Sequence, residues 1–160
     1  MTQPDDLADR LARIEQRLDA LEGGGETAEV DDSDPFWALR RMHDAVLFTG
    51  AVGLPGGEHY EWQQTVPAEG ILESDWTMQA PALAALAHPA RVRILREVLL
   101  GTRSAADLQA LDGIESTGQL YHHVRQLVAA GWLRTEARAR YTVPAERVVP
   151  LLVIIACAQH

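Results

Sequence analysis

The chain has 160 residues, of which 47% are hydrophobic, and its formal net charge is −9. This length is enough for one domain, or for one domain with an appendage, and the apolar content is enough for a core. The acidic balance excludes a generally basic nucleic-acid coat, and the single cysteine, Cys157, excludes an intrachain disulfide. The charge is uneven, however: residues 1–82 hold 5 Arg and 17 acidic residues, whereas residues 83–145 hold 8 Arg and 5 acidic residues.

Residues 1–22 predict an N-terminal coiled-coil helix, because apolar residues recur at alternating spacings of four and three. A lone helix of this length is marginal in water, so this seam is expected to pack on a partner. A homodimer, or a higher oligomer, is one interpretation, and docking onto the chain's own domain is the other. Residues 23–34 are acidic, begin with three glycines and predict a flexible linker. The seam residues are Leu7, Leu11, Ile14, Leu18 and Leu21.

Residues 35–77 predict a helix followed by a β-hairpin. The helix begins with Pro35 after an aspartate cap and continues to about Asp44. Two strands, Ala45–Leu54 and Glu58–Val66, are predicted around a Pro-Gly-Gly turn. Because a two-stranded hairpin is weak alone, it should lie on helices, extend another sheet or meet a dimer mate.

Aromatic side chains gather in this helix and hairpin, and residues 67–77 are predicted to form a connector anchored by Trp76. One interpretation is a pocket for a small-molecule effector. The other is that a small hairpin needs large side chains to bury enough area. The candidate pocket residues are Trp37, Phe48, Tyr60, Trp62 and Trp76.

Residues 78–145 predict a run of short helices and a strand pair. A helix over Pro81–Ala87 is broken at His88-Pro89, because the residue before proline disfavours helical geometry. The next helix, Ala90–Leu100, ends at a glycine, and Ser104 caps a short helix that continues to Leu111. A tight turn over 112–114 precedes a longer helix, and strands follow over 132–137 and 140–143.

The helix over residues 116–130 has two distinct faces. Ser116 is a candidate N-cap and Gln119 lies three residues on, which is the capping-box pattern. The apolar stripe of Leu120, Val124, Leu127 and Val128 predicts burial of one side. The opposite side carries Gln, Tyr, His and Arg, which can hydrogen-bond base edges or phosphates. An ordinary solvated polar face is the alternative.

Two short helices joined by a tight turn and followed by a strand pair predict a winged helix-turn-helix. In that arrangement the second helix enters the major groove, and the wing, residues 134–143, reaches the backbone or the minor groove. Arg138 and Arg140 occupy the wing, and Arg103 with Ser104 begins the first helix, where phosphate can meet backbone amides.

The stretches LAALAHPARVRILREVLLG and SAADLQALDGIESTGQLYHHVRQLVAAGWL resemble the ArsR-type winged-helix transcriptional regulators over about residues 82–143. The resemblance implies a homodimer that binds a duplex operator, usually as a repressor. It implies a structural role for His123 and a place near a phosphate for Arg125. It also implies that the residues facing the groove are Ser116, Thr117, Gln119, Tyr121 and His122.

The sequence departs from the metal-sensing members of that family, because their paired sensing cysteines are absent. His122 and His123 are adjacent and point about 100° apart on a helix, so they do not easily share one metal. Cys157 and His160 share a helix face, but a buried thiol near a frayed end is the favoured interpretation. We therefore expect neither a metal nor a cofactor.

Residues 146–160 predict a C-terminal dimerisation helix, because Val148–Ala158 is apolar on nearly all sides. Its predicted contact residues are Leu151, Leu152 and Ile155.

Together these features predict a mostly helical α+β protein, cytoplasmic because it lacks a signal peptide and a membrane-length apolar run. The expected function is dimeric, sequence-specific binding of double-stranded DNA to regulate transcription. Catalysis is not expected, because no P-loop, Rossmann glycine pattern or nucleophile elbow is present. The alternative is a winged-helix module that has lost DNA binding and serves protein assembly. The two hypotheses differ in salt dependence, which is steep for DNA binding.

Overall fold

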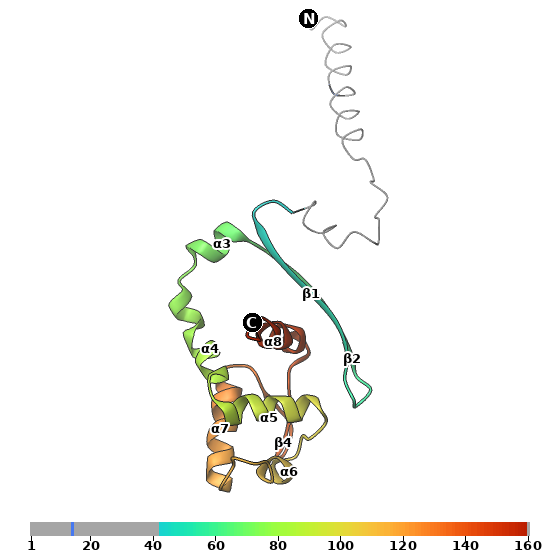
Figure 1. The fold of residues 1–160 in the computed structure, drawn as a ribbon, viewed down its shortest axis with the longest axis vertical. Helices are drawn as coiled ribbons and strands as arrows, with labels where there is room; N and C mark the ends of the chain where they lie inside the picture. The colour runs from blue at the N-terminus through green and yellow to red at the C-terminus, as the bar shows by residue number, and fades with distance from the viewer. Residues whose placement is uncertain (1–13, 15–41, 160) are drawn as a thin grey trace, which may run out of the picture. The chain divides into compact units, whose positions relative to one another are not determined.

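The structure, a computed structural model, describes Ile14 and residues 42–159, and residues from Asp44 onward form one compact unit. The predicted α+β class is confirmed by this unit, which combines helices with two small antiparallel sheets. Figure 1 shows its elements in chain order: β1 (Ala45–Gly53), β2 (His59–Pro67), α3 (Ala68–Glu73), the 3-10 helix η1 (Trp76–Gln79), α4 (Ala80–Leu86), α5 (Pro89–Leu99), α6 (Ala105–Gln109), α7 (Thr117–Ala129), β3 (Arg134–Ala137), β4 (Arg140–Thr142) and α8 (Ala145–Cys157).

Several predictions fall on residues outside this description. Ile14 is helical and exposed, but the four leucines of the predicted coiled-coil seam, the linker and Trp37 lie outside the described residues. The helix predicted to continue to about Asp44 does not reach that residue, since His43 and Asp44 form a bend and Asp44 has a φ of 47°.

The hairpin β1–β2 pairs in regular antiparallel register from Ala45 opposite Pro67 to Gly53 opposite His59. Paired residues share a face, so Phe48, Tyr60 and Trp62 lie on one side of the hairpin. That side packs on α8, where a Cβ added to Gly50 would lie 2.8 Å from Val149 Cγ1. Glycine therefore permits the close approach. The sequence left open whether the hairpin lies on helices, extends another sheet or meets a dimer mate, and in the structure it lies on a helix.

The prediction of a connector over residues 67–77 is wrong. Residues 68–73 form α3 and residues 76–79 form η1, whose first turn is capped by Asp75 accepting from the Thr77 backbone N at 2.9 Å. Trp76 is 61% exposed, although its Nε1 donates to the Ile71 carbonyl, so it is not a buried anchor. Both elements are too short for a hydrophobic period, and neither contains a buried residue.

The predicted break at His88-Pro89 is confirmed. His88 has extended backbone angles between α4 and α5, and its Nδ1 accepts from the Ala90 backbone N at 3.2 Å. Arg91 fixes the corner by donating to the carbonyls of Ala84 and Ala85 at 2.8 and 2.6 Å. These bonds therefore fix the orientation of α4 relative to α5.

The helix α8 lies between the β1–β2 hairpin and the helices α4 and α5 (Figure 1). Leu151 is 2% exposed within the chain's own core, so its predicted contact with a second subunit is wrong for this arrangement. Leu152 and Ile155 are partly buried against the same core. The apolar character of the helix is thus explained in part within the chain: Val148, Val149 and Leu151 are buried, whereas residues 152–155 are only partly buried.

The core of the helical part is built around Trp132 and Leu127. The Trp132 Nε1 donates to the carbonyl of Ala82 at 2.9 Å, which ties α4 to the segment after α7. Trp132 precedes β3 rather than belonging to it, contrary to the predicted strand over residues 132–137. The larger set of core residues from α5, α6 and α7 is Ile94, Leu95, Val98, Leu99, Leu108, Leu120 and Val124.

Candidate nucleic-acid interface

The pair α6–α7 begins each helix with a serine cap, as predicted. Ser104 Oγ accepts from the Asp107 backbone N at 3.1 Å, and Ser116 Oγ accepts from the Gln119 backbone N at 3.2 Å. The turn between the helices contains Gly113 with a φ of 83°, a conformation that side chains disfavour. These local features set where α7 begins.

One face of α7 is buried and the opposite face is exposed. Leu120, Val124 and Leu127 face the core, and the predicted packing role of His123 is confirmed by its exposure of 4%. Val128, which the sequence predicts to continue this apolar stripe, is 39% exposed. The exposed face of the helix carries Gly118, Tyr121, His122, Arg125 and Ala129.

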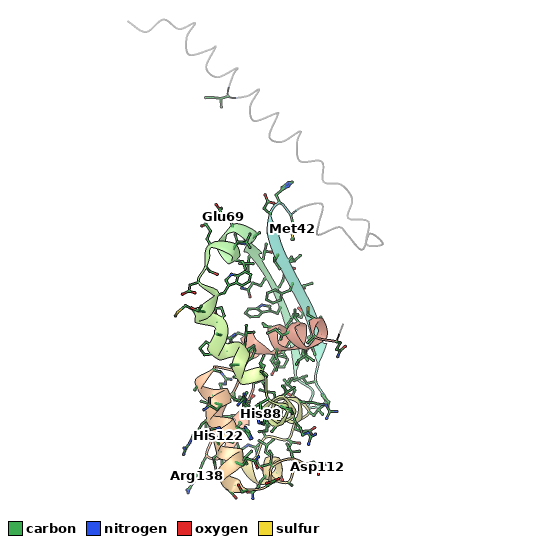
Figure 2. The ribbon with its side chains drawn as sticks, turned by 60° about the vertical axis from the view of Figure 1, so that its left-hand side comes forward. Met42, Glu69, His88, Asp112, His122 and Arg138 are labelled. Atoms are coloured by element: carbon green, nitrogen blue, oxygen red, sulfur yellow. The ribbon has the colours of Figure 1, made fainter. Side chains whose placement is uncertain are left out.

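The β3–β4 hairpin lies beside α7 and carries exposed arginines. Its ladder is irregular between Thr135 and Ala137, and Ala139 in the turn has a φ of 54°. Arg138 and Arg140 are exposed and have no ion pair with the residues described here. Figure 2 shows His122 and Arg138 at the same edge of the ribbon, with Asp112 at the opposite edge. The exposed face of α7 and this hairpin therefore lie at the same edge and carry several exposed arginines, with Glu136 as an exposed acid on the hairpin.

A shallow hollow of about 340 Å³ joins the two elements. It is lined by Tyr121, Arg125 and Val128 from α7 and by Thr135 and Tyr141 from the hairpin, among others. Burial raises the pKa of the Tyr141 phenol, with a further contribution from Tyr121, so Tyr141 stays protonated at neutral pH. The hollow thus joins α7 to the hairpin and is lined by two tyrosines and by one cationic side chain, Arg125.

Half of the predicted DNA-contacting side chains are engaged inside the protein. Arg103 forms an ion pair with Glu58, so its side chain is engaged within the chain, and its phosphate contact stays a prediction. The Ser104 and Ser116 hydroxyls serve the helix caps, and Gln119 Oε1 accepts from the Glu115 backbone N at 2.8 Å. The Thr117 hydroxyl donates to Gln109 Oε1 at 2.9 Å.

Five predicted residues have exposed side chains that make no hydrogen bond or ion pair within the described part of the chain: Tyr121, His122, Arg125, Arg138 and Arg140. The sequence interpretation missed Arg134, which is exposed on β3 next to this surface. Arg134 lies in the predicted strand over residues 132–137, next to the arginines of the predicted wing, and this position could have indicated a role in the same surface. The sequence interpretation also missed Glu58, which no sequence pattern connects with Arg103.

No protein-family model matches the chain, and no curated protein matches it. Among solved structures, the crystal structure of Rv0081 of M. tuberculosis is similar at 28% sequence identity, over 53% of this chain and 89% of that chain, with a TM-score of 0.43.

None of the hollows described here is lined by more than one of the predicted aromatic pocket residues. Tyr60 packs against the core, and Phe48 and Trp62 are half-buried on the hairpin face over α8. A hollow of about 540 Å³ on the hairpin is lined by Trp62 alone of the set, and Trp76 lies exposed on η1. The aromatic side chains of the hairpin therefore serve its packing on α8.

In the described ranges, no group of three or more His, Cys, Asp or Glu side chains has the arrangement of a metal site. Cys157 is exposed rather than buried, and His160 lies outside the description. No helix described here is both long and apolar enough to cross a membrane.

His123 is a buried histidine at the back of α7. Both of its ring nitrogens are buried without a hydrogen-bond partner among the described residues, and its ring centroid lies 4.6 Å from that of His88 and 5.7 Å from that of His122. Burial lowers the pKa of His123 below its usual value near 6.5, with further lowering by His88, His122 and Arg91. The imidazole is therefore neutral in the folded protein.

We expect stability to fall as the pH drops below about 6.5. The unfolded chain then binds a proton at His123 while the folded chain does not, and the loss continues until the lowered folded pKa is reached. One such proton gives a slope of at most about 1.4 kcal/mol per pH unit. Urea unfolding of wild type and His123→Leu between pH 7.5 and 5.5 measures it, and equal slopes for both would contradict this role.

Gln119→Ala is expected to lower the free energy of unfolding by about 1 kcal/mol, since it removes the side-chain half of the cap at α7. Gln126→Ala, on the exposed side of the same helix, is the control and should change stability by less than about 0.5 kcal/mol. Thermal or urea unfolding compares them. Equal stabilities would show that the cap contributes nothing.

Proposed function

We propose that the chain is a winged-helix transcriptional regulator that binds double-stranded DNA in a sequence-specific manner, most simply as a repressor. One observation carries this proposal. The exposed face of α7 carries Tyr121, His122 and Arg125, and the β3–β4 hairpin, which shares a hollow with α7, carries the exposed Arg138 and Arg140, in a protein whose other half is acidic.

The division of labour follows from the side chains. With α7 in the major groove, Tyr121 and His122 can hydrogen-bond base edges, and Gly118 lets the helix backbone approach the DNA. Arg125, Arg138 and Arg140 neutralise phosphates and release counterions. The fork of the guanidinium group suits phosphate oxygens. No catalytic step is part of this function.

We propose that the active form is a homodimer, because two symmetry-related helices about 34 Å apart read two half-sites of one duplex. The heptad seam of residues 1–22 is the proposed contact. Light scattering of the full chain is expected to give a dimer mass, and Leu11→Glu with Leu18→Glu is expected to shift it toward the monomer. An unchanged mass would exclude the seam as the contact.

The test of the function is a salt titration of binding to the duplex upstream of the chain's own gene, measured by fluorescence anisotropy against a scrambled duplex. We expect the affinity to fall steeply and linearly on logarithmic axes, with a slope of about −0.9 per phosphate contact. Specific binding should exceed binding to the scrambled duplex by at least about 10³-fold. Equal affinity for both duplexes would contradict sequence-specific reading.

A role in protein assembly is the second candidate, and one observation favours it. Leu72 on α3, together with Trp76 and Met78 on η1, exposes large apolar side chains along neighbouring elements. Exposed apolar patches of this kind mark contacts between proteins. An assembly interface of this kind should respond little to salt, so the same titration separates the two candidates.

A further inference from the structure

The tip of the β1–β2 hairpin has a defined conformation. The Leu54 backbone N donates to the Glu58 carbonyl at 2.8 Å, and the Gly57 backbone N donates to the Leu54 carbonyl at 2.9 Å. Gly57 has a φ of 88°, and a Cβ added to Gly56 would lie 2.5 Å from Glu58 Oε2. Because the hairpin also lies closely on α8 at Gly50, the Glu58 carboxylate is held at one place.

That carboxylate pairs with Arg103, which is 45 residues away in sequence. The side chains are only 33% and 19% exposed, so water screens the pair less than it screens a surface ion pair. The Arg103 side chain holds the pKa of Glu58 below its usual value, mainly through the hydrogen bond. Glu58 is therefore ionised at neutral pH.

Two atoms of this pair, Glu58 Oε2 and Arg103 Nε, are buried and have no other partner among the described residues. Arginine binds carboxylates through two parallel N–H···O bonds, for which its fork is preorganised. Arg103 and Glu58 have the donors and acceptors for this geometry: one bond is present through Nη2 and Oε1, and Nε and Oε2 are the donor and the acceptor that are left for a second.

The backbone of Arg103 holds the β3–β4 hairpin. Its carbonyl accepts from the Tyr141 backbone N at 2.9 Å. The next residue, Ser104, forms an antiparallel backbone bridge with Arg140, and the Ala105 backbone N donates to the Ala139 carbonyl at 2.9 Å. The β3–β4 hairpin is short and irregular, and two strands alone are marginally stable. The segment around Arg103 thus supports the two-stranded hairpin through an isolated bridge and two backbone hydrogen bonds.

We propose that Glu58 is a positioning residue for the β3–β4 hairpin: its ion pair with Arg103 fixes the backbone segment that bonds to the hairpin, and with it the place of Arg138 and Arg140. This inference rests on the proposed DNA binding and adds a role for the β1–β2 hairpin, which does not itself lie on the proposed DNA surface. Loss of the ion pair between Glu58 and Arg103 leaves α7 intact but removes the phosphate contacts of the arginines on the β3–β4 hairpin.

The test measures duplex binding by anisotropy for Glu58→Gln in the full chain. We expect the affinity to fall about fivefold to tenfold and the salt slope to fall by about 1–2, as expected for one or two lost phosphate contacts. Glu61→Gln is the matched control, because Glu61 lies on the same hairpin, is 77% exposed and does not contact Arg103. Removing either acid raises affinity through charge alone, so a decrease confined to Glu58→Gln is diagnostic.

A structural defect is separated from positioning by combining variants. In the Glu58→Gln background, Arg138→Ala should cost much less affinity than in wild type, whereas Arg125→Ala on α7 should cost the same in both. Partial unfolding lowers the active fraction without producing this selective pattern. Gly56→Ala, which displaces the Glu58 carboxylate while keeping its charge, should reproduce the Glu58→Gln result.

The positioning role would be overturned if Arg138→Ala cost as much duplex affinity in the Glu58→Gln background as in wild type, and if Glu58→Gln left the salt slope unchanged. The proposed function would still stand in that case. If wild type itself fails to bind duplex with steep salt dependence, both the proposed function and this inference fall.

Discussion

Trp132→Ala is expected to lower the free energy of unfolding by about 3–5 kcal/mol, the largest stability effect of any single change considered. Trp132 is 2% exposed, and its indole fills the space between α4 and the segment that follows α7. The substitution leaves a cavity, removes the hydrogen bond to the Ala82 carbonyl and removes the contact with Arg147, whose guanidinium lies 5.0 Å from the ring centroid.

Trp76→Ala is the matched control, since Trp76 is 61% exposed and is expected to cost less than about 1 kcal/mol. Urea unfolding followed by circular dichroism compares both variants with wild type. If Trp132→Ala were no more destabilising than Trp76→Ala, the described packing of α4 against the segment after α7 would be wrong.

Arg125→Ala combined with Arg138→Ala is expected to weaken duplex binding by at least about 100-fold, with similar losses for operator and scrambled duplexes. Each arginine supplies one charge-assisted contact to a phosphate, worth about 1.5 kcal/mol or more. The slope of affinity against salt should fall by about 2 for each protomer, since each contact contributes about 0.9. Anisotropy titrations at four salt concentrations measure both quantities.

The matched control is Arg93→Ala combined with Arg96→Ala on α5, which changes the net charge by the same amount. Arg93 donates to the Asp112 carbonyl and Arg96 pairs with Glu97, so neither belongs to the proposed surface. A loss of affinity equal to that of the first pair would show that overall charge, and not the α7 surface, determines binding.

Local signals in the sequence predicted the helices around the candidate site correctly. The side chains of Ser104 and Ser116 cap the helices that follow them, and glycines end α5 and α7. The break before Pro89 arises because the proline ring disfavours helical geometry at the preceding residue. These features act within a few residues, so the surrounding fold is not needed to predict them. The connector over residues 67–77 was mispredicted because α3 and η1 are too short to show a period.

The same capping logic reveals why Gln119 was assigned two roles. The sequence pattern identified it as the capping-box partner of Ser116, while the family resemblance placed it among the groove-facing residues. In the structure its Oε1 atom accepts from the backbone N of Glu115, one residue before the Ser116 cap, so the side chain stabilises the start of α7 without forming the predicted capping box. A residue type that suits both caps and bases cannot be assigned from type and spacing alone.

The sequence by itself determined the α+β class, the caps and turns, and the two faces of α7, because these depend on interactions between neighbours in the chain. Only the tertiary structure decided that α8 packs on the hairpin and the core of its own chain, that the hairpin aromatics lie on the face over α8, and that Arg103 forms an ion pair with Glu58. Each of these depends on which distant residues meet. The physical reason is that burial and ion pairing are properties of the assembled surfaces, and periodicity along one segment does not specify the segment that covers it.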